Sequence, residues 1–144
     1  PGWGRGDAVW ACDSRTGNCS DFHSLFIALC RAQELPARFE IGFGLPLERG
    51  KGELTGYHCW ANVRAGDRWL PFDLSEPKKL GVEAKGYRGR LPSNRVTMSI
   101  GRDLVLEPPQ EGPPLNFIVF PYAESGGKPI GDDRMKTVVR FTDR

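Results

Sequence analysis

The chain has 144 residues, of which 39% are hydrophobic and 26% are charged, and its formal net charge is +2. This length suits one domain with a sizeable core, and the near-neutral charge excludes the strongly basic balance typical of nucleic-acid-binding proteins. No apolar run approaches the roughly 20 residues that span a bilayer. We therefore expect a single domain over 1–144, with no nucleic-acid partner and no membrane span.

The four cysteines are too few for a disulfide-dense scaffold, and their spacing contains no CxxC pair that would indicate a structural zinc knuckle. The pairing of Cys12, Cys30 and Cys59 stays open. The chain begins with Pro rather than Met, so we expect a processed or trimmed chain whose targeting segment, if any, lies outside it. Its compartment and oligomeric state also stay open.

Residues 1–16 are rich in Gly and Trp, and we interpret them as an ordered lead-in. From Ser20 to about Leu35 apolar residues recur at helical spacing, and Pro36 would end the helix. This pattern predicts one main helix whose buried face carries Phe22, Leu25, Phe26, Leu29 and Ala32, with Ile27 and Cys30 beside it.

Alternating residues predict a half-buried strand over 38–44, which a polar loop over 45–56 follows. The apolar runs 57–64 and 69–74 flank Ala-Gly-Asp-Arg and predict a hairpin. Residues 78–95 are basic without an aromatic ladder, which favours a solvated loop. Further strands are expected over 95–106, 116–124 and 137–141. One helix packed on an antiparallel sheet is an α+β layout.

Cys19 stands at the start of the predicted helix. A thiol there lies near unpaired backbone N–H groups and the positive end of the helix dipole, which favours the thiolate when a cation or imidazole is also close. Taken alone, this position also suits a small packing residue. The choice between nucleophile and packing therefore depends on what lies opposite the helix.

The predicted hairpin over 57–64 and 69–74 contains an imidazole, His58, and a carboxylate, Asp73. If Gly66-Asp67 is a two-residue turn, Ala65 pairs with Arg68, and alternation puts His58, Trp60 and Asp73 on one face. Asp73 is then a diagonal neighbour of His58, at about 7–8 Å between backbones, which side chains can bridge. A carboxylate in that position would fix the imidazole tautomer and stabilise its charged form.

Some of these residues could also belong to a metal site. His23 shares a helix face with Cys19, so a zinc set could be written that adds His58 and Cys59. Because His58 and Cys59 are adjacent in a strand, they point to opposite faces, and we predict no metal and no cofactor. We expect Cys59 and Cys30 to be small buried packing residues.

Three segments, TGNCSDFHSLFIALCRAQELPARFEIGF, GYHCWANV and RWLPFDLSEP, together resemble the core of the transglutaminase-like superfamily. The family pattern is Gly-x-Cys on a helix that ends in Pro-Ala-Arg, then His-x-Trp on one strand and Trp-x-x-x-Asp on the next. The resemblance covers 16–77, the expected catalytic core, and 78–144 would add strands and loops that complete the sheet. The segments GWGRGDAVWACD and NRVTMSIGRD are similar to bacterial members.

The resemblance implies a papain-like α+β fold and a triad in which Cys19 attacks an acyl carbon, His58 acts as general base and acid, and Asp73 orients His58. It also implies an oxyanion donor, for which the Cys19 backbone N–H, Asn18, Trp10 and Trp60 are candidates, Trp60 also as a wall of the cleft. Family members are secreted, periplasmic or cytoplasmic.

We therefore predict a cysteine-dependent hydrolase of peptide or protein amides, or an acyltransferase, that forms a thioester. The competing hypothesis is a non-catalytic module that keeps the fold and binds peptide or glycan in the cleft. The polar loop up to Gly56 immediately precedes His58, so we expect it to border that cleft.

Overall fold

The computed structural model describes residues 2–48, 50–131 and 133–143. Pro1 of the predicted lead-in and Arg49 of the predicted loop lie outside these ranges. The helices are α1 (Ala8–Ser14), α2 (Cys19–Ala32), α3 (Glu76–Leu80) and the short 3-10 helix η1 (Ala84–Tyr87). The strands are β1 (Ala37–Gly44), β2 (Lys51–Leu54), β3 (His58–Ala65), β4 (Arg68–Phe72), β5 (Arg95–Ile100), β6 (Glu124–Ser125), β7 (Lys128–Pro129) and β8 (Val139–Thr142).

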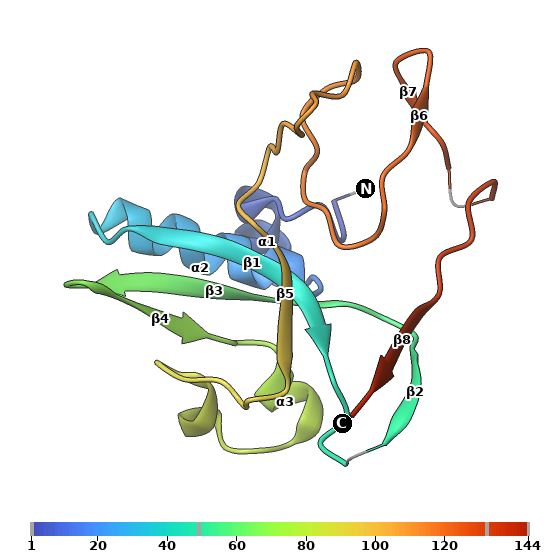
Figure 1. The fold of residues 1–144 in the computed structure, drawn as a ribbon. Coiled ribbons are helices and arrows are strands. Elements are labelled where there is room, and N and C mark those ends of the chain that lie inside the picture. The colour runs from blue at the N-terminus through green and yellow to red at the C-terminus, as the bar shows by residue number, and fades with distance from the viewer. Residues whose placement is uncertain (1, 49, 132, 144) are drawn as a thin grey trace.

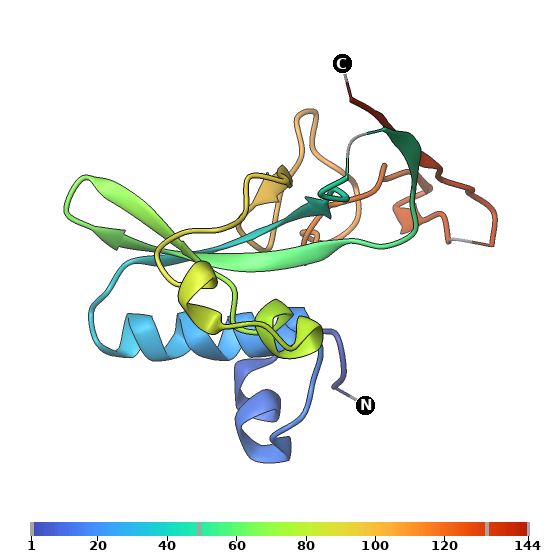
Figure 2. The ribbon, with the colours of Figure 1, turned by 90° about the horizontal axis from the view of Figure 1, so that it is seen from below.

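Four strands form the central sheet in the order β4-β3-β1-β5, and every neighbouring pair is antiparallel. Helix α2 lies along one face of this sheet, with α1 packed on its outer side (Figures 1 and 2). The expected α+β class, with one main helix on an antiparallel sheet, is confirmed. In the described ranges, no helix is both long and apolar enough to cross a membrane.

The hairpin of β3 and β4 has the predicted register. Ala65 pairs with Arg68 and Ala61 with Phe72, so the turn falls at Gly66-Asp67 as expected. Gly66 has a φ of 60°, a left-handed conformation that costs glycine little and that two-residue hairpin turns require. This register carries β4 to its end at Phe72, and Asp73 follows immediately.

The core lies between α2 and the sheet, and α2 presents only part of the predicted face to it. Leu29, on the predicted buried face, is 59% exposed, and Ala32 is exposed as well. The residues of α2 that are buried are Ser20, Asp21, His23, Ser24, Ile27 and Cys30. The prediction is confirmed for Ile27 and Cys30, which are buried, and for Phe26, which packs against the core. It was wrong for Leu29 and Ala32, because the buried stripe is polar at its amino end, where hydrogen bonds replace apolar contacts.

Several shorter elements differ from their predictions. The lead-in contains α1, whose amino end is capped by the Asp7 carboxylate through the Trp10 N–H at 3.0 Å. Part of the predicted loop over 45–56 is β2, which pairs with β8 at the far end of the chain. The expected loop before Asn94 holds α3 and η1, and β5 ends at Ile100 rather than at Leu106.

The strand predicted over 116–124 is absent from the described chain, where only the two-residue β6 overlaps it. Its apolar side chains pack on the sheet: Phe117 lies 6.0 Å from Phe39 and Phe120 lies 5.8 Å from Phe43, between ring centroids. The Ser99 hydroxyl donates to the Ile118 carbonyl at 2.5 Å. The alternation in this segment therefore reflects side-chain packing without a backbone ladder.

Asp21 joins the lead-in to the start of α2. Its carboxylate is fully buried and accepts three backbone N–H groups, from Gly4 at 2.8 Å, Gly6 at 2.9 Å and Asn18 at 2.9 Å. Asp21 thus closes a capping box with Asn18 and also holds the residues before α1. The shape of the turn that precedes Cys19 depends on this carboxylate.

Asp21→Ala is expected to lower the free energy of unfolding by about 3 kcal/mol, because it leaves several backbone donors without an acceptor. Chemical denaturation followed by circular dichroism measures the change. The exposed Asp13 of α1 provides the matched control, and Asp13→Ala should leave the midpoint nearly unchanged. Equal midpoints for the two variants would contradict the role given to Asp21.

Candidate active site

Cys19 is the first residue of α2, and the helix cap leaves its backbone N–H free. The Asn18 side-chain oxygen accepts the N–H groups of Ser20 at 2.8 Å and Asp21 at 3.3 Å. Among the residues that the structure describes, the Cys19 N–H has no hydrogen-bond partner. Gly17 precedes this cap with a φ of 153°, and a Cβ there would lie 2.6 Å from the Asp21 Cβ, so the tight turn requires glycine.

His58 and Asp73 are joined by a short hydrogen bond. His58 Nε2 lies 2.5 Å from Asp73 Oδ2, so the other ring nitrogen, Nδ1, is left to face the Cys19 sulfur. The second Asp73 oxygen accepts the N–H groups of Ser75 at 3.1 Å and Glu76 at 3.0 Å, and the Ser75 hydroxyl at 3.2 Å. Asp73 is 1% exposed and thus buried with both oxygens hydrogen-bonded.

These contacts shift the protonation of the two reactive groups in opposite directions. A hydrogen bond with the Cys59 thiol is the largest influence on Cys19; burial opposes it, and the bond to His58 and its positive charge assist, so the pKa of Cys19 falls to about 4. Burial acts to lower the pKa of His58, but hydrogen bonds with Asp73 and Cys19 raise it to about 9. A thiolate and an imidazolium therefore coexist between these values.

Burial acts to raise the pKa of Asp73, but the hydrogen bond with His58 and the positive charge of that ring hold it well below its usual range. The carboxylate is therefore ionised wherever His58 is charged. An ionised partner at Nε2 both orients the ring and stabilises the imidazolium.

Cys19 and His58 open onto a cleft of about 570 Å³. Residues 53–57, which directly precede His58, form one wall, so the expectation that this segment borders the cleft is confirmed. The cleft is lined by Asn18, Cys19, Gly44, Pro46, Glu53, Leu54, Thr55, Gly56, Tyr57, His58, Ser75, Glu76 and Lys79.

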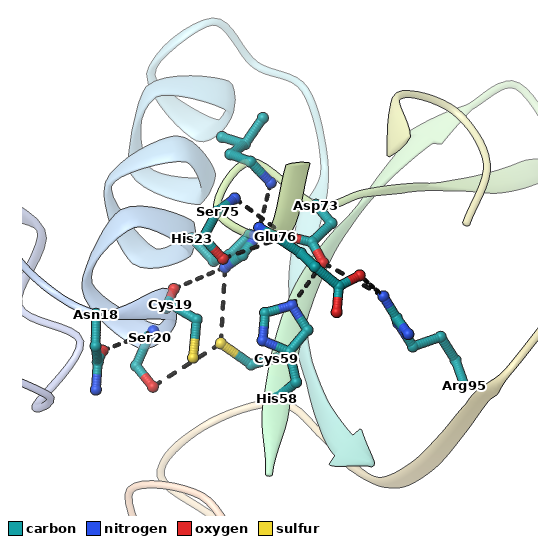
Figure 3. Close-up of polar contacts among 11 residues, drawn as sticks. Asn18, Cys19, Ser20, His23, His58, Cys59, Asp73, Ser75, Glu76 and Arg95 are labelled. Carbon is teal, nitrogen blue, oxygen red and sulfur yellow. Dashed lines mark hydrogen bonds and ion pairs between the residues drawn. The ribbon is translucent and has the colours of Figure 1, made fainter. Parts of the chain in front are cut away.

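His23 is a buried residue of the site and lies on the face of α2 that carries Cys19, as its spacing of four residues indicated. Its Nε2 accepts the Leu74 N–H at 3.0 Å, and because a backbone N–H can only donate, the ring proton lies on Nδ1. That nitrogen donates to the Cys19 carbonyl at 2.6 Å. His23 Nε2 also lies 3.5 Å from Asp73 Oδ1, but this nitrogen accepts the shorter hydrogen bond from Leu74 and carries no proton to share with the carboxylate. The His23 side chain spans two elements. It thus joins the first turn of α2 to the segment after β4 (Figure 3).

The remaining predicted site residues, Trp60, Trp10 and Asn18, occupy different positions. Trp60 is 2% exposed, and its indole N–H donates to Glu40 at 3.0 Å, so this N–H is not directed into the cleft. Trp10 lies on α1, against Gly2, and is not among the residues that line the cleft. Asn18 does line the cleft, but its side-chain oxygen is occupied by the helix cap.

One group of potential metal ligands lies within the described ranges. Ligand atoms of His58, Asp73 and Glu76 are all within 4.8 Å of one another. Glu76, however, is paired with the Arg95 guanidinium, which also lies 3.8 Å from Asp73. A cation here would have to break the His58–Asp73 bond beside a buried arginine, so these residues do not fit a metal site.

Comparison with known proteins agrees with this geometry. The sequence model of the transglutaminase-like superfamily matches residues 1–74. A curated protein of Haemophilus influenzae, described only as uncharacterized, is 33% identical over 79% of this chain, which spans 39% of that relative's length. No solved structure matches significantly. The family match extends over half of the chain, and the protein belongs to the transglutaminase-like superfamily.

Proposed function

We propose that this protein is a cysteine-dependent amide hydrolase or acyltransferase that acts through a thioester on Cys19. The observation that carries the proposal is the alignment of the Cys19 sulfur, the His58 ring and the buried Asp73 carboxylate at one wall of the cleft (Figure 3). Cysteine-dependent catalysis is the chemistry that the superfamily suggests. The substrate is a peptide or protein amide.

The Cys19 thiolate attacks the carbonyl carbon of the amide and forms a C–S bond. The negative charge that develops on the carbonyl oxygen is stabilised by the free Cys19 N–H, with the Asn18 amide as the second candidate donor. The His58 imidazolium gives its proton to the departing amine, which breaks the C–N bond and leaves the thioester. His58, now neutral, removes a proton from water or from an acceptor amine, which attacks the thioester and regenerates the thiolate.

The acyl-enzyme is the species that tests this proposal. Intact-protein mass spectrometry after rapid acid quenching should detect an adduct that maps to Cys19 when the protein is incubated with peptide amides. Adding a primary amine should yield an acyl-amine product if the protein is a transferase, and only the free acid if it is a hydrolase. An adduct on another residue, or turnover of the same peptides with no dependence on Cys19, would contradict the thioester mechanism.

Activity should follow a bell-shaped pH profile because it needs the thiolate and the imidazolium together. It should fall below about pH 4, where Cys19 takes up its proton, and above about pH 9, where His58 loses its own. Initial rates check both limbs, and alkylation of Cys19 by iodoacetamide checks the acid limb, with the denatured protein as the control. If native Cys19 is alkylated only in the alkaline range, Cys19 and His58 do not form a thiolate–imidazolium pair.

A further inference from the structure

An ion pair lies beside the carboxylate of the proposed triad. The Arg95 guanidinium, from β5, pairs with the carboxylate of Glu76, from α3, and the same nitrogen, Nη2, lies 3.8 Å from Asp73 Oδ2. The Arg95 side chain is 8% exposed and that of Asp73 is fully buried, so this charge has little contact with water. Figure 3 shows Arg95 reaching toward the two carboxylates from the side opposite Cys19.

The Arg95 guanidinium is held in a fixed position. Its Nη1 donates to the Asn94 side-chain oxygen at 2.9 Å, and its central carbon lies 5.9 Å from the centre of the Trp60 ring. Gly44, which pairs with Arg95 across β1 and β5, makes room for the group, since a Cβ there would lie 3.0 Å from Nη1. Residues of β1 and β3 and the residue before β5 therefore place this charge beside the two carboxylates.

His58 has two carboxylates within reach, but its Nε2 proton can be shared with only one. A ring nitrogen of His58 and one oxygen each of Asp73 and Glu76 all lie within 4.8 Å of one another. Asp73 makes the short bond to Nε2. The Glu76 N–H donates to Asp73 at 3.0 Å, so the backbone keeps the second carboxylate close. A Glu76 side chain without its arginine would compete with Asp73 for the imidazole.

The arginine needs the glutamate for a matching reason. Arg95 Nη2 approaches Asp73 at Oδ2, which is the oxygen that binds His58. A buried charge that loses its partner is costly, so a guanidinium without Glu76 would move onto Asp73 and weaken the bond to the imidazole. Because Arg95 and Glu76 neutralise each other, neither disturbs the bond between Asp73 and His58.

We propose that Arg95 and Glu76 are positioning residues, whose ion pair engages the second carboxylate and the buried cation and so reserves Asp73 for His58. This inference rests on the proposed function, since it concerns the orientation of the same imidazole toward Cys19 before a substrate arrives. The charged and titratable groups around the His58 ring are Cys19, His23, Asp73, Glu76 and Arg95, with the exposed Lys79 in the same cleft.

The test is the pKa of His58, followed by NMR titration of its ring C–H signals in single and double variants. Arg95→Met removes a positive charge and should raise this pKa from about 9 by about one pH unit, the low end of the effect of a charge within about 4–6 Å. Glu76→Gln removes a negative charge and should lower it by a similar amount. The double variant restores the net charge and should return the pKa to its wild-type value.

Turnover of peptide amides gives a second readout. Each single substitution should lower kcat by roughly ten- to a hundredfold, the size of effect of a misplacement of about 1 Å, and the double variant should regain most of the rate. Arg140→Met is the matched control, because it breaks an ion pair with Glu53 that is exposed on both sides. This control should leave the His58 pKa and the rate unchanged.

The direction of the shifts decides between positioning and simple packing. Shifts of the same sign in Arg95→Met and Glu76→Gln, or no shift in either, would overturn the positioning role. If Arg95→Met does not fold, Glu76→Gln decides alone: a lower His58 pKa supports the proposal and an unchanged one contradicts it.

These outcomes are separate from those of the proposed function. The NMR titration needs no substrate, so opposite shifts would support the role of the ion pair even in a protein that does not turn over amides. Wild-type Cys19 that is alkylated only in the alkaline range would count against the nucleophile and not against the ion pair.

Discussion

Cys19→Ala is expected to abolish amide turnover, with a loss of about 10⁶-fold in kcat, the size found when a triad nucleophile is removed. The free Cys19 N–H and the cleft would remain, so the variant should still bind its substrate while it forms no acyl adduct. Steady-state kinetics and intact-protein mass spectrometry measure both properties on peptide amides.

The matched control for this variant is Cys12→Ala, which removes an exposed thiol from α1. Its kinetics should equal those of the wild type. Substantial turnover by Cys19→Ala would contradict the role of Cys19 as the nucleophile. If the wild type binds peptide amides but does not turn them over, the competing hypothesis of a non-catalytic binding module holds.

Asp73→Asn is expected to lower kcat by about 10⁴-fold with little loss of stability, by analogy with the loss of the orienting carboxylate in serine proteases. The asparagine oxygen can keep the three donors of Ser75 and Glu76. Its amide NH₂ would then face His58 Nε2 and force the ring proton onto Nδ1. That tautomer presents a donor to Cys19 and cannot accept its proton.

Kinetics across the pH range give the sharper readout for this variant. Without the carboxylate that raises the pKa of His58, the alkaline limb of the profile should move to lower pH. Asp67→Asn, in the exposed hairpin turn, is the matched control and should leave rate and profile unchanged. If the Asp73→Asn variant keeps the wild-type rate, Asp73 does not take part in the proposed catalysis.

The hairpin was predictable because its rules are local. A two-residue turn at Gly66-Asp67 fixes the register of β3 and β4, and strand alternation then brings Asp73 to His58. The presence of α2 was also predictable, since the apolar pattern indicates a helix from about Ser20 and Pro36 would end it, and the observed helix begins at Cys19. These elements carry the three residues of the proposed triad.

The burial of the polar residues beside the proposed triad was not predictable from hydrophobic periodicity. Ser20, His23 and Ser24 lie on the buried stripe of α2, yet each is polar, so the pattern assigned the core to the neighbouring apolar face. Their burial is compensated by hydrogen bonds to β3, to the segment after β4 and to the distant Arg102. Such partners, separated widely in sequence, leave no periodic signal.

Pairings between distant segments escaped prediction for the same reason. β2 and β8 are each four residues long and lie far apart along the chain, so neither provides a hairpin signal. The segment 116–124 alternates like a strand, but its aromatic rings pack on β1 while its backbone forms no ladder. Side-chain alternation alone could not distinguish a strand that pairs with another strand from a segment that only packs its side chains on the sheet.

The buried Asp21 carboxylate has a consequence for local unfolding. One side chain accepts the amide protons of Gly4, Gly6 and Asn18, so the lead-in cannot open without releasing the turn that presents Cys19. Hydrogen–deuterium exchange should therefore find these three amides exchanging at a common rate, as a single cooperative unit. In such a unit, a proteolytic cut that frees the first six residues would inactivate the nucleophile and leave every catalytic side chain chemically intact.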